Sequence, residues 1–356
     1  MKSRGSFFIC LAALSVVPVA ALAAGPSKKE PAPKAQTQPA APVISQPAPA
    51  PAASPPVAPA PGAAPVAPPI IAPVTDPALN PDLAFGAYQM GKYLAAFQEA
   101  TKRIEADSND APAMVLIGEL YLEGLGLKRN EAEAFRWFAL AAKRGDKNAQ
   151  FALALQKLEG KGTDKDKAGA KALLEQAAAQ NHPGAFYNLG VLAIEGDGVT
   201  KDFATAAALF RKAADLGDLD ALYSLGLLLR EGQGVEKNPA EAAALLLKAA
   251  QEKHVNSMVE IGVMLFNGIG VQKDETAAAN WFLKASVGGN PIAQNRVARL
   301  YASGRGVTQD KIKASFWHVI ARARGLPDEW LDGVLNGLTP EEKIKVQAEV
   351  ERYLGT

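Results

Sequence analysis

The chain has 356 residues, enough for two average domains or for one long array of repeats. Its 38 Lys and Arg residues nearly balance its 37 Asp and Glu residues, which argues against a dedicated nucleic-acid-binding protein. Three histidines and one cysteine, Cys10, supply little material for metal or nucleophilic chemistry. We therefore expect no catalytic residue, no metal site, no cofactor and no nucleic-acid partner.

Residues 1–23 have the pattern of a signal peptide. Lys2 and Arg4 precede an apolar stretch, and the small residues that end at Ala23 suit a signal peptidase, so we expect cleavage after Ala23. The alternative is an uncleaved membrane anchor, because residues 7–24 are largely apolar. Cleavage predicts a periplasmic or secreted protein without a membrane span.

Residues 24–81 form a linker rich in proline and alanine, which holds 18 of the chain's 25 prolines. Proline lacks a backbone donor and alanine has little apolar surface, so this composition cannot build a sheet, a helix or a core. We expect a disordered, extended spacer that reaches up to roughly 170 Å at about 3.1 Å per residue. It is interpreted either as a tether across an envelope layer or as a passive solubilising segment.

The rest of the chain repeats with a period of 36 residues. Its clearest mark is a Gly-x-Gly pair that recurs six times in constant register. These pairs are not phosphate-binding loops, because none follows a strand pattern, and repetition at this length is typical of a solenoid. We expect the second glycine of each pair to occupy a turn with positive φ. These glycines are Gly126, Gly162, Gly198, Gly234, Gly270 and Gly306.

Each unit also carries the marks of two helices. A Gly or Ala eight residues before the second glycine lets the helices approach closely, and bulky pairs followed by alanines mark the second helix. The second helix is expected to end at Gly or Asn, except at Lys253, where the turn should be slightly strained. Four residues after each pair stands an Asp or Asn suited to cap that helix. These caps are Asn130, Asp166, Asp202, Asn238, Asp274 and Asp310.

One such hairpin cannot bury its apolar stripe alone, so neighbouring hairpins must stack to form a core. The pattern resembles the Sel-one-like repeat (SLR), a relative of the tetratricopeptide repeat, most fully at residues 185–217 and 293–325. Unit two departs from it at Lys157 and Thr163, where the family prefers Tyr and Val. The resemblance implies an all-α, right-handed α-solenoid with six units at residues 111–326.

Two helical segments are expected to flank the six units. Residues 82–110 predict a shorter helix pair of tetratricopeptide type with Gly91 and Tyr93 at its turn. Residues 327–356 predict capping helices, the last of which begins at a capping box headed by Thr339.

Residues that select a partner are expected on the first helix of each unit, which lines the concave face in this superfamily. Side chains at equivalent positions differ there in charge and size, as a binding groove requires. We expect an acidic end, a basic end and an apolar middle, although such charges also serve solubility. The candidate groove residues are Glu119, Glu123, Val191, Leu227, Arg230, Glu260, Arg296 and Arg299.

Two other sets of polar residues recur. His182 and His254 share one register, expected to be a solvent-facing slot, whereas His318 replaces a Phe and is expected in a less enclosed last repeat, packed under the C-terminal helices. One register just before the glycine turns holds glutamates. We interpret it as a solvated position rather than as an acidic ladder for a basic partner or a cation. These residues are Glu123, Glu159, Glu195 and Glu231.

These features favour a non-enzymatic scaffold of the bacterial cell envelope that binds segments of another envelope protein. The resemblance implies adaptor roles in signalling or assembly. The alternative is a protein that binds or hydrolyses cell-wall material, either peptidoglycan or β-lactams, as reported for cysteine-rich members of the family. The mature chain lacks their cysteine pairs, and we find neither Ser-x-x-Lys nor Gly-x-Ser-x-Gly.

Overall fold

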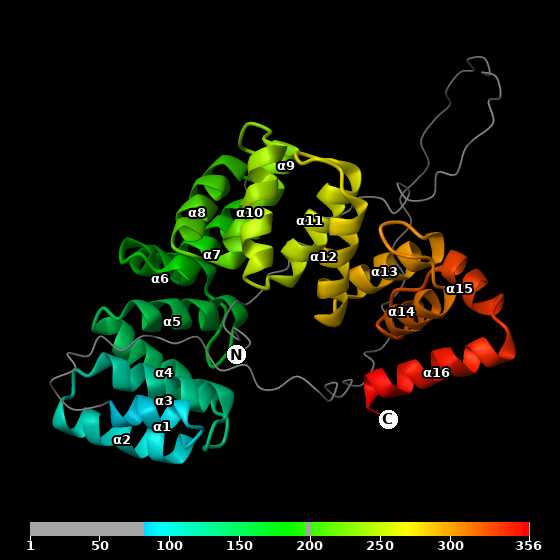
Figure 1. Ribbon diagram of the computed structural model, residues 1–356. Helices are drawn as coiled ribbons and strands as arrows, with labels where there is room; N and C mark the ends of the chain where they lie inside the picture. The colour runs from blue at the N-terminus through cyan, green and yellow to red at the C-terminus, as the bar shows by residue number, and fades with distance from the viewer. Residues whose placement is uncertain (1–81, 197–200, 356) are drawn as a thin grey trace, which may run out of the picture. The chain divides into compact units, whose positions relative to one another are not determined.

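The computed structural model describes residues 82–196 and 201–355. The predicted signal peptide, the predicted linker and Gly198 lie outside the described residues. The described residues belong to one compact unit and form sixteen helices (Figure 1). No helix in this part of the chain is long and apolar enough to cross a membrane.

Twelve of the helices form six consecutive hairpins, which we call repeats 1 to 6. In each repeat both helices have 13 residues. The six pairs are α3 (Ala111–Glu123) and α4 (Glu131–Lys143); α5 (Lys147–Glu159) and α6 (Lys167–Ala179); α7 (Pro183–Glu195) and α8 (Phe203–Asp215); α9 (Leu219–Glu231) and α10 (Pro239–Gln251); α11 (Val255–Asn267) and α12 (Glu275–Val287); α13 (Pro291–Ser303) and α14 (Lys311–Ala323). The predicted all-α architecture of stacked hairpins is therefore confirmed.

Every repeat helix begins at a side chain that accepts a backbone N–H of its first turn, which would otherwise lack a partner. The second helices start at the Asp and Asn residues picked out by the glycine register, including Asp202, Asp274 and Asp310. The first helices start at a second set of caps, one at each junction between hairpins. This set is Asp110, Asp146, His182, Asp218, His254 and Asn290.

Left-handed residues end the helices. The first glycine of the described turns follows the first helix, for example Gly232 with φ 75°. The second helices end just before Gly145, Asn181, Gly217, Lys253, Gly289 and Gly325, all with positive φ. Lys253 is the one residue of this set that is neither Gly nor Asn, and its φ of 68° is unfavourable for a side chain that bears a Cβ.

A glycine in the first helix lets the two helices of a hairpin touch. A Cβ at Gly118 would stand 2.7 Å from the Phe138 ring, and a Cβ at Gly190 would stand 2.6 Å from Phe210. Where the first helix instead has an alanine, as at Ala298, the residue 20 positions later is smaller than Phe. A phenylalanine at the second of these positions therefore always faces a glycine at the first.

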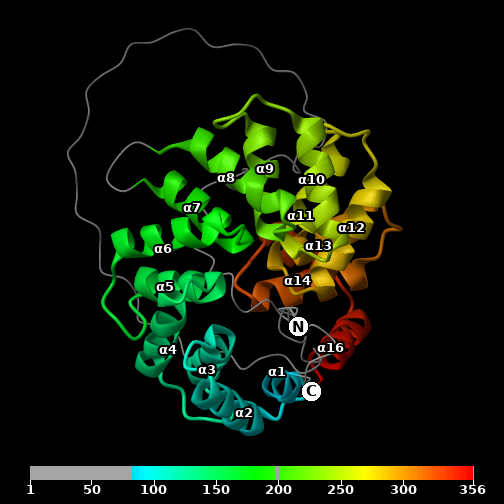
Figure 2. The same ribbon diagram turned by 90° about the vertical axis from the view of Figure 1, so that its left-hand side faces the viewer.

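The second turn glycines that the structure describes join their repeats to the helix pair before them. A Cβ at Gly306 would overlap the backbone carbonyl of Glu275, and a Cβ at Gly270 would overlap that of Pro239. Gly126, Gly162, Gly234 and Gly306 have φ between 67° and 70°, so only glycine satisfies both the conformation and the contact. Consecutive hairpins accordingly lie side by side (Figures 1 and 2).

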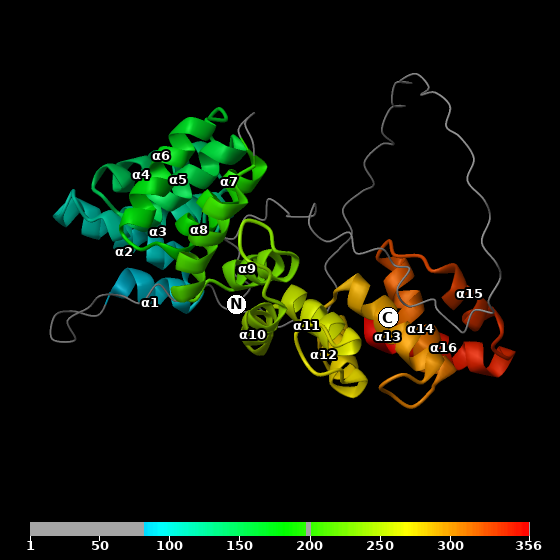
Figure 3. The same cartoon turned by 90° about the horizontal axis from the view of Figure 1, so that it is seen from above.

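Four helices flank the repeats. Helices α1 (Leu83–Gln89) and α2 (Tyr93–Ala106) precede repeat 1, whereas α15 (Glu329–Asn336) and α16 (Pro340–Leu354) follow repeat 6 and pack against α14 (Figure 3). Thr339 forms a capping box with Glu342 at the start of α16. Tyr353 near the end of α16 makes edge-on ring contacts with two aromatic side chains of α14.

Candidate interaction surfaces of the repeats

The expected apolar middle of the groove is not open. Val191 is 3% exposed and Leu227 is 2% exposed, so both side chains belong to the core. The expectation of an apolar surface at these two positions was therefore wrong. Each is covered because a first helix in the middle of the array has a neighbouring hairpin on both sides, and its apolar side chains pack against these neighbours.

Arg230 lies in the last turn of α9, with only 7% of its side chain exposed. Its Nη1 donates to Oε2 of Glu260 in α11 at 2.5 Å, and its Nε donates to Glu231 at 2.7 Å. Two predicted groove residues, Arg230 and Glu260, are thus brought together as a nearly buried ion pair that links repeats 4 and 5.

Arg299 in α13 is held by the C-terminal helices. Its Nε and Nη2 donate to the two carboxylate oxygens of Asp328 at 2.7 and 2.9 Å, and Asp328 also caps α15. The guanidinium lies 5.3 Å from the ring centre of Trp330, which is 50% exposed. This predicted groove cation therefore attaches a flanking helix to repeat 6.

Arg296, three positions earlier on α13, differs from the other two arginines. It is half-buried, and its Nε is covered by protein without a hydrogen-bond partner among the described residues. Its guanidinium lies 5.8 Å from the ring centre of Phe282, and burial lowers its pKa although the negative charge of Glu260 opposes this shift. Arg296 is the predicted groove cation that the described protein leaves unpaired.

The expected acidic end of the groove consists of Glu119 and Glu123 on α3. Glu123 is exposed, whereas Glu119 is half-buried. Burial raises the pKa of Glu119 to about 7, and the charges of Glu123 and Asp146 add to the shift. Near neutral pH this carboxyl therefore changes between its neutral and charged forms, and it does not act as a permanent negative charge.

Three of the four glutamates before the glycine turns contact a cation. Glu159 lies 2.7 Å from Lys161, Glu195 lies 3.6 Å from Lys167, and Glu231 accepts from Arg230. A pair of this kind at the surface contributes little to stability, but it neutralises the carboxylate. Of the four, only Glu159 is half-buried and the others are exposed, so the geometry supports the interpretation of this register as a solvated position.

The histidines at the junctions are helix caps rather than solvent-facing residues, which corrects the expectation for this register. His182 caps α7 through its Nδ1, which accepts the backbone N–H of Ala185 at 3.2 Å, and its ring stacks on Phe151. Burial lowers the pKa of His182 to about 4, so the imidazole is neutral at physiological pH. The sequence contained a signal for this capping role, because the equivalent positions in other repeats hold the common capping residues Asp146, Asp218 and Asn290.

His254 forms an arrangement that outwardly resembles a catalytic triad. Its Nδ1 lies 2.7 Å from Oγ of Ser257, and its Nε2 lies 3.0 Å from Oδ1 of Asp220. However, Ser257 is 0% exposed, and its backbone N–H donates to the same Nδ1 in the capping bond of α11. A substrate cannot reach this hydroxyl, so the geometry serves helix capping and the junction of repeats 4 and 5.

His318 lies beneath the C-terminal helices, as expected, although the last repeat is not less enclosed there. The residue is 0% exposed, and its Nε2 lies 2.7 Å from Oδ1 of Asp332 in α15. The same oxygen accepts from Arg322 at 2.9 Å. His318 is therefore a second polar link between repeat 6 and the flanking helices.

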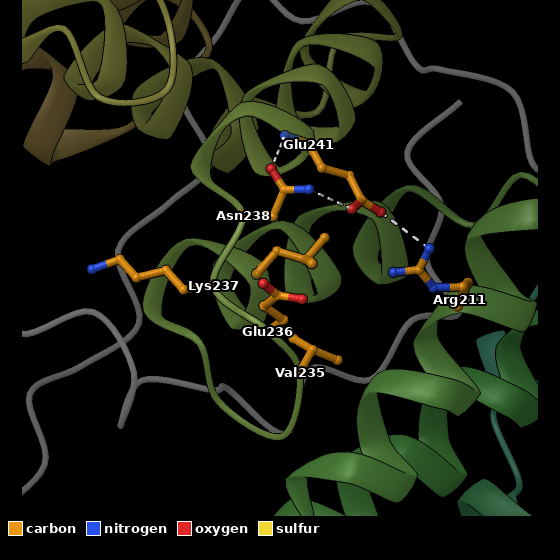
Figure 4. A pocket seen from close by; sticks show the side chains of 7 residues that line it. Arg211, Val235, Glu236, Lys237, Asn238 and Glu241 are labelled. Atoms are coloured by element: carbon orange, nitrogen blue, oxygen red, sulfur yellow. Dashed lines mark hydrogen bonds and ion pairs between the residues drawn. The ribbon is translucent and has the colours of Figure 1, made fainter.

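Two shallow pockets lie one repeat apart, and sequence reasoning missed both. Each is lined by residues of two consecutive second helices, of the first helix between them and of its turn. The first has a volume of about 320 Å³, and the ion pair between Arg211 and Glu241, at 3.0 Å, lies on its wall (Figure 4). The second has a volume of about 450 Å³ and has Leu247 and Ala277 at the equivalent positions, 36 residues later. Only a comparison of equivalent positions on the second helices could have indicated this change from polar to apolar.

Comparison with known proteins matches the repeats. The model of the Sel1 repeat family matches residues 111–146, 147–182, 185–218, 219–254, 255–290 and 291–326. A solved Sel1 repeat protein from Oxalobacter formigenes is 28% identical, with a TM-score of 0.60, and the match covers 68% of this chain and 97% of that one. No curated protein matches the chain.

Two further solved structures are more distantly similar to the chain. A protective antigen of uropathogenic Escherichia coli with an SLR fold is 24% identical, with a TM-score of 0.47 and coverage of 77% of this chain and 67% of the other. An immunity protein from Pseudomonas aeruginosa is 20% identical, with a TM-score of 0.40 and coverage of 60% and 81%. Because six consecutive matches span residues 111–326, more than half of its length, the chain belongs to the Sel1 repeat family.

Proposed function

We propose that the protein is a non-enzymatic interaction scaffold of the bacterial cell envelope, which binds a segment of a partner protein on the first helices of its repeats. Stacked helical repeats form a regular framework whose surface residues can vary without changing the fold, and such frameworks typically bind other proteins. The envelope location rests on the signal-peptide pattern of residues 1–23.

One observation carries the proposal: α13, a first helix, presents side chains that the framework does not need. Ile292 is 48% exposed, and Arg296 follows it by one helical turn, so both lie on one face of the helix. The capping residues and turn glycines of the same repeat keep the common pattern. Ile292 and Arg296 are therefore available for contact with a partner.

The test is retention of envelope proteins by the purified full chain, with two matched variants. Ile292→Glu places a charge on the first-helix face. Val287→Glu places the same charge on a residue that is 69% exposed at the end of second helix α12. We expect a specific protein, identified by mass spectrometry, to be retained by the wild type and by Val287→Glu but lost by Ile292→Glu.

Two results would contradict the proposal. Equal retention by both variants would remove the first-helix face from it, and recovery of wall fragments without a specific protein would favour the glycan-binding alternative. The location is tested separately by cell fractionation and by sequencing the N-terminus of the mature protein, which we expect to start at Ala24. A chain found in the cytoplasm with its leader intact would refute the envelope assignment.

A further inference from the structure

Three arginines around α13 are paired with carboxylates, whereas Arg296 is not. Arg299 is paired with Asp328, and Arg230 is paired with Glu260. Arg305, at the turn after α13, reaches both oxygens of Glu275 at 3.2 and 2.6 Å. Arg296 has no hydrogen bond or ion pair within residues 82–196 and 201–355, and its buried Nε lacks an acceptor.

Nearby protein groups do not supply an acceptor for Arg296. Glu260 stands at the equivalent position of the preceding first helix, but its Oε2 already accepts from Arg230. The positive charge of Arg299 acts against that of Arg296, and the Phe282 ring supplies only a weak contact at 5.8 Å. Burying a charged donor without an acceptor is unfavourable, so Arg296 is costly to the unliganded protein.

A carboxylate is the ligand that fits this arrangement. The guanidinium is a planar group of N–H donors, and of its three nitrogens only Nε is covered by protein. Its two Nη atoms can donate to the two oxygens of a carboxylate. Two exposed apolar side chains lie along the same stripe of α13. Ile292 precedes Arg296 by one helical turn, and Trp330 contacts the guanidinium of Arg299. A peptide is therefore favoured over a small free anion.

We propose that Arg296 anchors an Asp or Glu side chain of a partner peptide that also carries apolar residues for Ile292 and Trp330. This inference rests on the proposed function and adds the chemistry of the partner segment to it. The site is selective for acidic, partly apolar sequences, because a basic segment would meet Arg296 and Arg299 with like charge.

The test uses the purified full chain on an immobilised array of random 12-residue peptides, followed by titration of the best binder in solution. We expect bound peptides to be enriched in Asp and Glu next to apolar residues. Arg296→Gln should weaken binding of the best peptide at least tenfold, which corresponds to about 1.4 kcal/mol. The control Arg136→Gln removes an equal charge from a second helix, at a side chain that is 72% exposed, and should bind as the wild type does.

A double-mutant cycle identifies the contact. When the anchoring acidic residue of the peptide is changed to its amide, the wild type should lose the same affinity, and Arg296→Gln should lose little more. Arg296→Gln should also melt at or above the wild-type temperature, because an unpaired, half-buried charge is removed. This result would separate lost binding from lost folding.

The outcomes are distinguishable from those of the proposed function. Peptides that bind without acidic residues, or that bind Arg296→Gln unchanged, would overturn this inference and leave the scaffold proposal standing. An array on which the wild type binds no peptide would overturn both.

Discussion

Both ends of the repeat array hold their flanking helices through contacts between an arginine and an aspartate. At the N-terminal end, Arg103 of α2 contacts Asp82 at 2.7 Å and Asp110 at 2.8 Å, which are the caps of α1 and α3. At the C-terminal end, Arg299 of α13 contacts Asp328, the cap of α15. In both cases a guanidinium joins a flanking helix to a repeat helix through a carboxylate that caps one of these two helices.

The ends differ in how deeply this contact is buried and in the charge that remains. The side chain of Arg103 is 34% exposed, whereas those of Arg299 and Asp328 are 19% and 5% exposed. Repeat 1 retains the half-buried carboxyl of Glu119, and repeat 6 retains the half-buried guanidinium of Arg296. A charge in the sequence therefore says little about the surface until the flanking helices are placed.

The largest losses of stability at both ends should appear at the turn glycines. Gly306→Val adds a Cβ that overlaps the carbonyl of Glu275 at a φ of 67°, and we expect it to lower the free energy of unfolding by about 4 kcal/mol. Gly126→Val meets the backbone N of Leu94 at 2.8 Å and should cost about 3 kcal/mol. Urea denaturation of each variant measures both values.

Gly333→Ala is the control for these two variants, because this helical glycine has open space around it and no positive φ. It should leave stability unchanged or raise it by up to about 1 kcal/mol. Equal melting of Gly306→Val and Gly333→Ala would show that the turn contact has been assigned incorrectly.

The two arginine contacts should rank next. Arg299→Ala leaves the nearly buried carboxylate of Asp328 unpaired and should cost about 3 kcal/mol. Arg103→Ala leaves two more exposed carboxylates and should cost about 1 kcal/mol. The comparison is made by denaturation at neutral pH. A larger loss for Arg103→Ala would reverse the order of the two ends.

Glu119 allows a smaller, pH-dependent test of the N-terminal end. Its pKa of about 7 exceeds the usual 4.5, so the folded state binds more protons than the unfolded state between these pH values. Stability from this group is therefore present below about pH 4.5 and is lost as pH rises to 7. Glu119→Gln should raise stability by about 1 kcal/mol at pH 8 and by much less at pH 4.5, as thermal melts at both pH values would show. An equal gain at both would mean that ionisation is not the cause.

The smallest difference is expected at the caps of the second helices. Asp310 accepts two backbone N–H groups, both at 3.0 Å, whereas Asn130 accepts one at 3.2 Å. Asp310→Ala should therefore cost about 1 kcal/mol and Asn130→Ala about 0.5 kcal/mol in thermal melts. Asp274→Ala, with one bond at 2.8 Å, provides an intermediate reference. The ranking fails if Asn130→Ala is the most harmful.

The fold of the repeats could be predicted because its signals are local. A cap such as Asp274 bonds to an N–H three residues away, and a turn glycine such as Gly234 marks its own backbone conformation. A period of 36 residues then repeats these signals six times. The register of His182 was visible for the same reason, but it was misinterpreted, because its equivalents Asp146 and Asp218 were not recognised as caps of the following helix.

The candidate groove could be predicted only in part, because exposure depends on contacts that the period does not describe. The repeat register places Val191 and Leu227 on one stripe, but it does not say how far the next hairpin covers that stripe. The partner of Arg299 lies 29 residues away, in a helix outside the repeats. Arg296 and Arg299 look alike in the sequence, and only the position of Asp328 separates them.

The turn glycines have a consequence for how such an array changes in evolution. Glu275 precedes Gly306 by 31 positions, as Pro239 precedes Gly270, so the junctions between repeats that the structure describes use the same two places in consecutive units. Recombination that removes or duplicates one whole unit joins a standard turn to a standard helix start. The number of repeats can therefore change in a single genetic event without a new interface having to evolve, and the variable first-helix residues are exchanged as complete cassettes.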